Sequence, residues 1–228
     1  MGSSDRLVPI RKAAGAGCRL RHIYLRLAAI GRLLKTGMRV LRSRMTDLEF
    51  RACVLGNPFN GELLRRLQPM RLRECHLTAG CLFQTVWNRI SERDPAWGIK
   101  DYDIFYFDDQ DLSWDAEDQV VRRVAEATAD LPISVEIKNQ ARVHLWYRER
   151  FGGDYPALDS ARAGIDRYLI SCTCVGIDVP TGNLYAPNGL ADLASGALHM
   201  NPLNPRPELF RQKAESYRSR WPWLRIVD

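Results

Sequence analysis

Two aspartates separated by one residue, Asp101 and Asp103, are the part of the sequence that most directly suggests chemistry. Residues two apart in a strand leave the same face, so both carboxylates would point to one side of a sheet. Burying two unpartnered carboxylates together is costly. A divalent cation removes the conflict, and Mg²⁺ favours one or two carboxylates together with substrate phosphates. The alternative is a water-facing aspartate pair at the end of a strand.

A third acidic residue, Glu136, extends this pattern. Apolar and polar residues alternate strictly over residues 133–138, which predicts a half-buried strand with Glu136 on its polar side. If this strand lies beside the aspartates, three carboxylates could form a two-metal site for in-line phosphoryl or nucleotidyl transfer. The alternative is a surface glutamate paired with Lys138 or Arg142.

A turn of small residues, Thr78-Ala79-Gly80-Cys81, joins a short apolar segment to a helix that we expect over residues 81–92. Free backbone N–H groups at the start of a helix form a natural seat for phosphate. Cys81 could also be a reactive thiol in this position, but no neighbouring residue supplies its base. The turn is therefore a candidate phosphate-binding element.

The elements that must position these residues predict an α/β (α+β) domain, with a small mixed sheet wrapped by helices. In residues 100–107, large apolar side chains occur at alternate positions on both faces of the expected strand, which indicates a central strand. The helix capped by Ser113 should bury Trp114, Val121, Val124 and Leu131. Further helices are expected over 46–55 and 60–68, from Asn139 to Gly152-Gly153, from Ser160 to about Ser171, near 189–196 within a long loop over 178–206, and from Pro207 to Trp221.

Charge divides the chain into two segments. Residues 1–44 hold eleven Lys or Arg and one acidic residue, Asp5, whereas residues 45–228 hold 22 basic and 26 acidic residues. We interpret 1–44 as a basic N-terminal extension outside the core and 45–228 as one domain. The extension is interpreted as a solvated basic helix, an arm for nucleic acid or a membrane surface, a transit-like peptide, or translated sequence upstream of a true start at Met45.

The overall composition is that of a globular chain of 228 residues, 46% of them hydrophobic and 26% charged. No run of 18 apolar residues is present, so we expect no transmembrane helix. Six dispersed cysteines favour reduced thiols and a cytoplasmic location. The mildly acidic domain disfavours a long nucleic acid as partner and favours a small molecule or a protein.

Taken together, Gly80-Cys81, Asp101-Tyr102-Asp103 and Glu136 resemble the pattern of the nucleotidyltransferase superfamily with the DNA-polymerase-beta-like fold. Over about residues 48–225 the chain is similar to a family of uncharacterised bacterial nucleotidyltransferase-like proteins. Four runs carry this similarity: QTVWN (84–88), GIKDYDIFYF (98–107), DLSW (111–114) and EIKNQARVHLW (136–146). The resemblance implies Asp101 and Asp103 on metal, Glu136 as the third carboxylate, and the turn at Gly80 and Cys81 on the triphosphate.

The leading hypothesis is therefore a Mg²⁺-dependent nucleotidyltransferase that moves a nucleoside monophosphate from an NTP to an unknown acceptor. We expect the acceptor to be a small molecule or a protein, and we expect no membrane partner. A nucleotide-sugar glycosyltransferase that holds its metal with a DxD motif is one alternative. A catalytically degenerate protein that binds a nucleotide or a partner is the other. Its support is Cys81, where the superfamily has Gly or Ser, and the 19 residues between Cys81 and Asp101.

Overall fold

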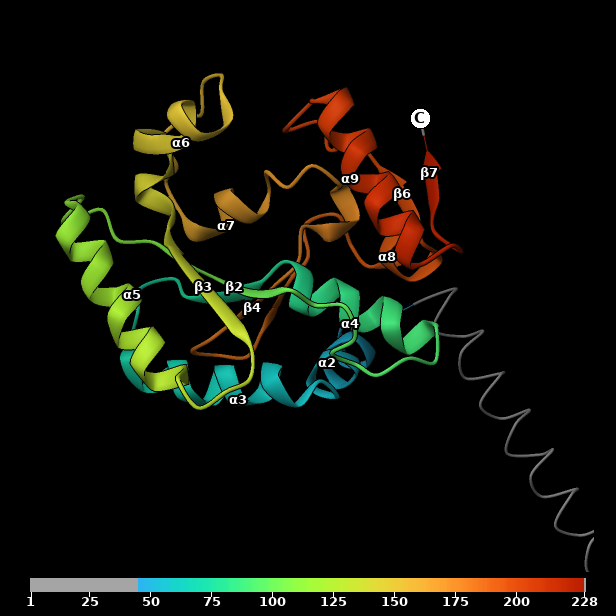
Figure 1. Ribbon diagram of the computed structural model, residues 1–228, viewed down its shortest axis with the longest axis horizontal. Helices are drawn as coiled ribbons and strands as arrows, with labels where there is room; N and C mark the ends of the chain where they lie inside the picture. The colour runs from blue at the N-terminus through green and yellow to red at the C-terminus, as the bar shows by residue number, and fades with distance from the viewer. Residues whose placement is uncertain (1–44, 228) are drawn as a thin grey trace, which may run out of the picture. The chain divides into compact units, whose positions relative to one another are not determined.

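The computed structural model describes residues 45–227, and its centre is a five-stranded mixed sheet (Figure 1). The strand order is β3-β2-β1-β4-β5. Strands β2 and β3 pair in parallel, and the other neighbours pair antiparallel. The strands are β1 (His76–Thr78), β2 (Asp101–Tyr106), β3 (Ser134–Asn139), β4 (Gly176–Asp178) and β5 (Leu184–Tyr185). The expected mixed sheet with an internal strand at β2 is confirmed.

Helices cover both faces of this sheet, with α3 on one side and α6 and α7 on the other (Figure 1). The helices are α2 (Asp47–Leu55), α3 (Pro58–Leu67), α4 (Gly80–Ile90), α5 (Trp114–Thr128), α6 (Val143–Phe151), α7 (Ala161–Ile165), α8 (Ala191–Ser195) and α9 (Pro207–Arg220). Short 3₁₀ turns are η1 (Gln68–Met70), η2 (Gln140–Arg142) and η3 (Ser171–Thr173), and β6 (Ala197–His199) pairs in parallel with β7 (Arg225–Val227).

Local capping residues account for where several helices begin. Thr46 and Glu49 form a capping box on α2, and Asn57 caps α3 with Pro58 in its first turn. Ser113 and Ser160 accept backbone N–H groups at the starts of α5 and α7. These side chains satisfy amides that have no partner within the helix, so the helix starts follow from local sequence.

Two helix predictions were wrong at their ends. The helix expected from residue 60 already begins at Pro58, because Asn57 caps it. The helix capped by Ser160 ends at Ile165 instead of near Ser171. Its continuation is replaced by tertiary hydrogen bonds, since the Asn201 side chain donates to the carbonyls of Asp166 and Tyr168.

The burial predicted for α5 was also partly wrong. Val124 is buried, whereas Trp114 is 64% exposed and Val121 is 37% exposed. Helix α5 packs beside the edge strand β3 and presents only one narrow stripe, including Val124 and Thr128, to the core.

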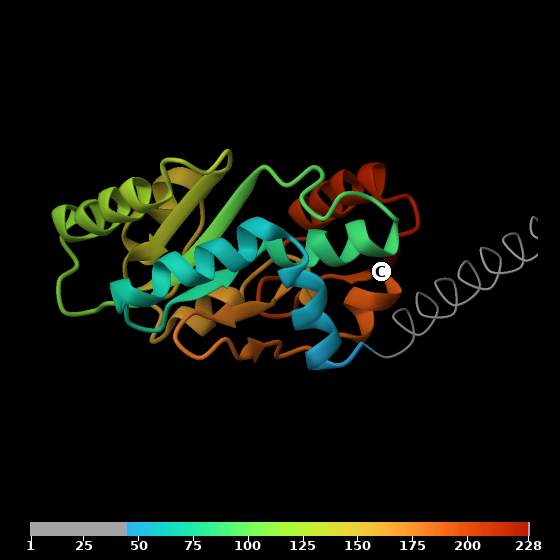
Figure 2. The same cartoon turned by 90° about the horizontal axis from the view of Figure 1, so that it is seen from below.

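The sheet has one apolar face and one polar face. Tyr102, Ile104 and Tyr106 of β2 are buried on the face covered by α3, which Figure 2 shows from the α3 side. The Tyr102 hydroxyl accepts a hydrogen bond from the Asn57 side chain at 3.1 Å. The alternate residues of β2, which include Asp101 and Asp103, point to the opposite face of the sheet, away from this packing. The alternation within β2 thus puts the two aspartates on the other face of the sheet.

Side chains of α4 hold the C-terminal helix in place. The Trp221 indole N–H donates to the Asn88 side-chain oxygen at 3.0 Å, and Arg220 donates to the Gln84 side-chain oxygen at 3.0 Å. Gln84 and Asn88 are four residues apart, so they share one face of α4. The first of the four sequence runs noted above therefore fixes the C-terminal end of α9 against the middle and second half of α4.

Residues 1–44, which we assign to a basic extension, lie outside the described residues. Met45 is 8% exposed and belongs to the main hydrophobic core. We expect a chain that begins at Met45 to keep the melting temperature of the full chain within about 2–4 °C, the shift that roughly 1 kcal/mol produces in a protein of this size. Thermal unfolding of both chains checks this. A larger fall would place the domain boundary before residue 45.

No helix within residues 45–227 is long and apolar enough to cross a bilayer.

Candidate active site

The two aspartates lie at the first and third positions of β2, on the polar face of the sheet. Asp103 pairs with Thr78 of β1 on one side and with Glu136 of β3 on the other. Cross-strand neighbours in a sheet are about 5 Å apart and point to the same face. The parallel pairing of β2 and β3 thus places Glu136 next to Asp103.

None of these three carboxylates has a hydrogen bond or an ion pair with another side chain of residues 45–227. The Arg142 proposed as a partner of Glu136 instead pairs with Glu117. The pKa of Asp103 is raised to about 7, mainly by burial and also by the nearby charges of Asp101 and Glu136, against opposing effects of Lys213 and Lys138. The sheet therefore holds an incompletely neutralised acidic group beside a cavity.

The turn between β1 and α4 brings a second polar feature to the same place. Ala79 has φ 62° and ψ −137°, a region that residues with a side chain rarely adopt. Its carbonyl accepts the N–H groups of Leu82 and Phe83. The amides of Gly80 and Cys81 donate to no protein group among the described residues. Cys81 is fully buried, so of these two N–H groups only that of Gly80, which lines a cavity, is available to an anion.

Replacing Ala79 by Gly should stabilise the protein, because glycine adopts this backbone conformation without a steric penalty. We expect a gain of about 1 kcal/mol and a melting temperature roughly 2–4 °C higher. Thermal unfolding measures this gain, with Ala52→Gly in the interior of α2 as a control that should instead be destabilised. A lower melting temperature for Ala79→Gly would show that the turn is not strained.

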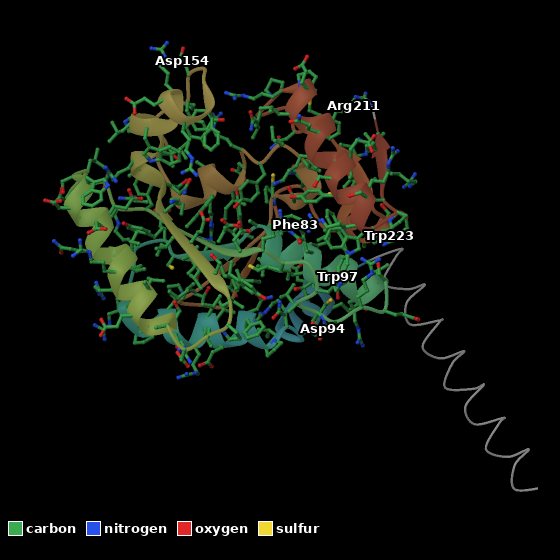
Figure 3. The ribbon with its side chains drawn as sticks, in the orientation of Figure 1. Phe83, Asp94, Trp97, Asp154, Arg211 and Trp223 are labelled. Atoms are coloured by element: carbon green, nitrogen blue, oxygen red, sulfur yellow. The ribbon has the colours of Figure 1, made fainter. Side chains whose placement is uncertain are left out.

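The two aspartates and the turn line one cavity of about 280 Å³. Asp101, Asp103 and Gly80 form part of its wall, and Lys213 and Tyr217 of α9 stand across from them. In Figure 3, Phe83 lies between the start of α4 and α9, in agreement with its ring contact to Tyr217 at 5.4 Å between centroids. The cavity thus combines two acidic groups, the free amide of Gly80 and a lysine.

A second cavity of about 670 Å³ adjoins the first. Both cavities are lined by Asp103, Arg167 and Tyr168, and only the second reaches Glu136 and α6. Asp103 therefore stands where two separate binding volumes meet. Such a division suits a reaction between two substrates.

Sequence reasoning missed the residues that α9 and the segment after α7 contribute. Lys213 lies next to the buried positions Phe210, Ala214 and Tyr217 of α9, whose spacing marks the packed face of the helix. That spacing could have indicated a lysine at the edge of the core. No local pattern indicates that Arg167 lines the same cavities as Asp103, because this arrangement depends on how distant elements pack.

The Cys81 side chain does not form part of a reactive site. It is fully buried, its Sγ donates to the Thr78 carbonyl, and burial raises its pKa well above the ordinary value. The idea of a reactive thiol at this position is therefore wrong. Cys81 is also absent from the wall of the cavity, which Gly80 lines.

Within residues 45–227, no set of three or more His, Cys, Asp or Glu side chains is arranged as the ligands of one metal ion. A two-carboxylate site is nevertheless suited to Mg²⁺, which keeps waters and takes substrate phosphates as its other ligands. A half-buried Asp103 with no partner side chain among residues 45–227, beside Asp101, fits such a cation, because charges removed from water are usually paired or bound to metal.

Residues 65–226 match the model of a protein family described as nucleotidyltransferase. A solved structure titled "The NMR structure of the protein reveals a CCA-adding enzyme head domain" matches with a TM-score of 0.65 and 22% sequence identity. The alignment covers 82% of this chain and 99% of that one. A search of curated proteins returned no match. The structural likeness agrees with the mixed sheet and surrounding helices described above.

Proposed function

Since this chain belongs to a nucleotidyltransferase family, and is thus a transferase, we propose that it moves a nucleoside monophosphate from an NTP to an acceptor hydroxyl with the help of Mg²⁺. The observation that carries this proposal is the shared cavity wall of Asp101, Asp103 and Gly80. Carboxylates for a cation and free amides for phosphate are the two requirements of a triphosphate substrate.

In the proposed reaction, the acceptor oxygen forms a bond to the α-phosphorus, the bond to the β-phosphate oxygen breaks, and pyrophosphate leaves. Asp101 and Asp103 would hold Mg²⁺, which neutralises phosphate charge. The amide of Gly80 binds a phosphate oxygen, and Lys213, which lines the same cavity, adds positive charge. Glu136 accepts the proton of the acceptor, since it lies beside Asp103 on the second cavity.

The two alternatives differ from this proposal in what they would bind. A glycosyltransferase would use the aspartates on metal but would give Glu136 and the turn at Gly80 no role. A degenerate protein would bind a nucleotide without turnover. Family membership favours nucleotidyl transfer over sugar transfer. We further propose that the protein acts in the cytoplasm, where NTP and Mg²⁺ occur together.

Calorimetric titration of the full chain with each NTP, with and without Mg²⁺, tests the proposed binding step. We expect affinity for at least one NTP that depends on Mg²⁺ and is lost in Asp101→Asn. Asp115→Asn, which changes an exposed carboxylate on α5, is the matched control and should bind normally. A preference for UDP-sugars, or NTP binding that ignores both Mg²⁺ and Asp101, would contradict the proposal.

A further inference from the structure

The second cavity, about 670 Å³ in volume, has a lining of unusual chemistry. It combines four basic side chains with several aromatic rings around one space: Lys138, Arg150, Arg167 and Arg206, with Trp146, Tyr147, Phe151, Tyr155 and Tyr168. We propose that this cavity binds the acceptor, and that the acceptor is a small molecule in which a flat ring is joined to a phosphate, as in a nucleoside monophosphate. This inference rests on the proposed function.

The first argument is charge. Among the described residues, none of Arg150, Arg167 and Arg206, which line the cavity, forms an ion pair. By contrast, Arg148, which lies on α6 together with Arg150, pairs with Asp154 at 3.0 Å. Figure 3 shows Asp154 at the outer tip of the segment after α6. Guanidinium groups without a carboxylate partner that line a cavity are suited to an anionic ligand, and their fork geometry matches phosphate oxygens.

The second argument is the arrangement of rings. Tyr147 stacks on Tyr155 with 4.3 Å between centroids. Arg206 lies 5.3 Å from the Tyr147 ring, and Arg167 lies 5.6 Å from the Tyr155 ring. Phe151 remains 55% exposed beside this pair. Flat aromatic faces next to guanidinium groups provide stacking for a planar ring and charge for a phosphate attached to it.

The third argument is position. The cavity reaches both Asp103 and Glu136, and it shares Asp103 with the cavity that we assign to the NTP. A molecule bound here by its ring and its phosphate can present a hydroxyl to Glu136. The volume lies within the range of about 300–1,000 Å³ that is usual for small-molecule sites. The geometry therefore favours a compact acceptor that contains both a planar ring and a phosphate.

A long nucleic acid fits the charge distribution less well. Residues 45–228 contain 22 basic and 26 acidic residues, so the domain offers no excess of positive charge for a track of phosphates. The basic groups described above line a cavity of limited size. A single phosphorylated ring satisfies them, whereas a long strand would need further cationic surface.

Calorimetric binding of AMP, adenosine and ribose 5-phosphate to the full chain tests the inference. We expect AMP to bind more tightly than either fragment. Arg206→Gln should weaken AMP binding about tenfold, the effect of losing one charged hydrogen bond. Arg148→Gln, on the outer side of α6, is the matched control and should not change it. Tyr147→Leu should weaken AMP and adenosine but leave ribose 5-phosphate unchanged.

The outcomes separate this inference from the proposed function. If Mg²⁺-dependent NTP binding is intact while AMP binds no better than its fragments, or ignores Arg206→Gln, the inference is wrong and the function stands. If AMP binding behaves as expected but no NTP binds, the acceptor role is overturned. If an RNA oligonucleotide binds more tightly than AMP and this binding is lost in Arg206→Gln, the small-molecule class is overturned.

Discussion

Asp103→Asn should abolish Mg²⁺-dependent nucleotidyl transfer while leaving the fold intact or more stable. We expect turnover to fall by about a thousandfold or more, because the charge stabilisation lost with the metal is worth several kcal/mol. Steady-state rates of pyrophosphate release measure this loss. Asp115→Asn, an exposed change on α5, should keep full turnover and controls for the loss of a negative charge.

The same variant has a distinct stability signature in metal-free buffer. The pKa of Asp103 is raised to about 7 in the folded protein, against about 3.9 when unfolded. The folded state therefore binds its proton more tightly, and the free energy of unfolding falls as the pH rises from about 4 to 7. Asp103→Asn removes this loss, so its melting temperature at pH 8 should exceed that of the unmodified chain by at least the 2–4 °C that about 1 kcal/mol produces in a protein of this size.

This difference between the two proteins should disappear near pH 3.5, where the aspartate is protonated in both states. Thermal unfolding between pH 3.5 and 8 tests the expectation. A variant that is less stable at pH 8 would show that the Asp103 carboxylate makes a favourable contact in the folded protein.

Glu136→Gln should reduce kcat by about 10²–10⁴-fold, the usual contribution of a general base. Because Asp101 and Asp103 remain, the affinity for Mg²⁺ and NTP should change much less than kcat. Steady-state rates over pH 5–9, together with calorimetric NTP affinities, measure both effects.

Glu149→Gln is a matched control, because Glu149 lies exposed on α6. It should leave kcat and the pH profile unchanged. If Glu136→Gln lowers metal affinity as strongly as Asp103→Asn does, Glu136 acts as a metal ligand and the proton acceptor must be sought elsewhere in the second cavity.

Local chemistry explains which parts of the fold could be predicted from the sequence. Ser113 and Asn139 cap neighbouring amides, so the segment boundaries there depend on adjacent residues alone. The common face of Asp101 and Asp103 follows from the period of a strand. The strands β4 to β7 were not predicted, because each has only two or three residues and is held by pairing with distant segments.

The candidate site likewise combines features that local sequence predicts with features that depend on tertiary packing. The spacing of Asp101 and Asp103 indicated a metal site, but the position of Glu136 beside Asp103 depends on the parallel register of β2 and β3. The approach of Lys213 and Arg167 depends on how α9 and the segment after α7 pack. Periodicity and capping describe single elements, whereas these contacts arise only when separate elements meet.

Release of pyrophosphate from NTP labelled on the α-phosphate tests the central claim most directly. In the presence of Mg²⁺ the full chain should release pyrophosphate and transfer the labelled nucleoside monophosphate to AMP or, more slowly, to water. Asp103→Asn should do neither. Release of inorganic phosphate in place of pyrophosphate, or equal turnover by the unmodified chain and Asp103→Asn, would contradict nucleotidyl transfer at these carboxylates.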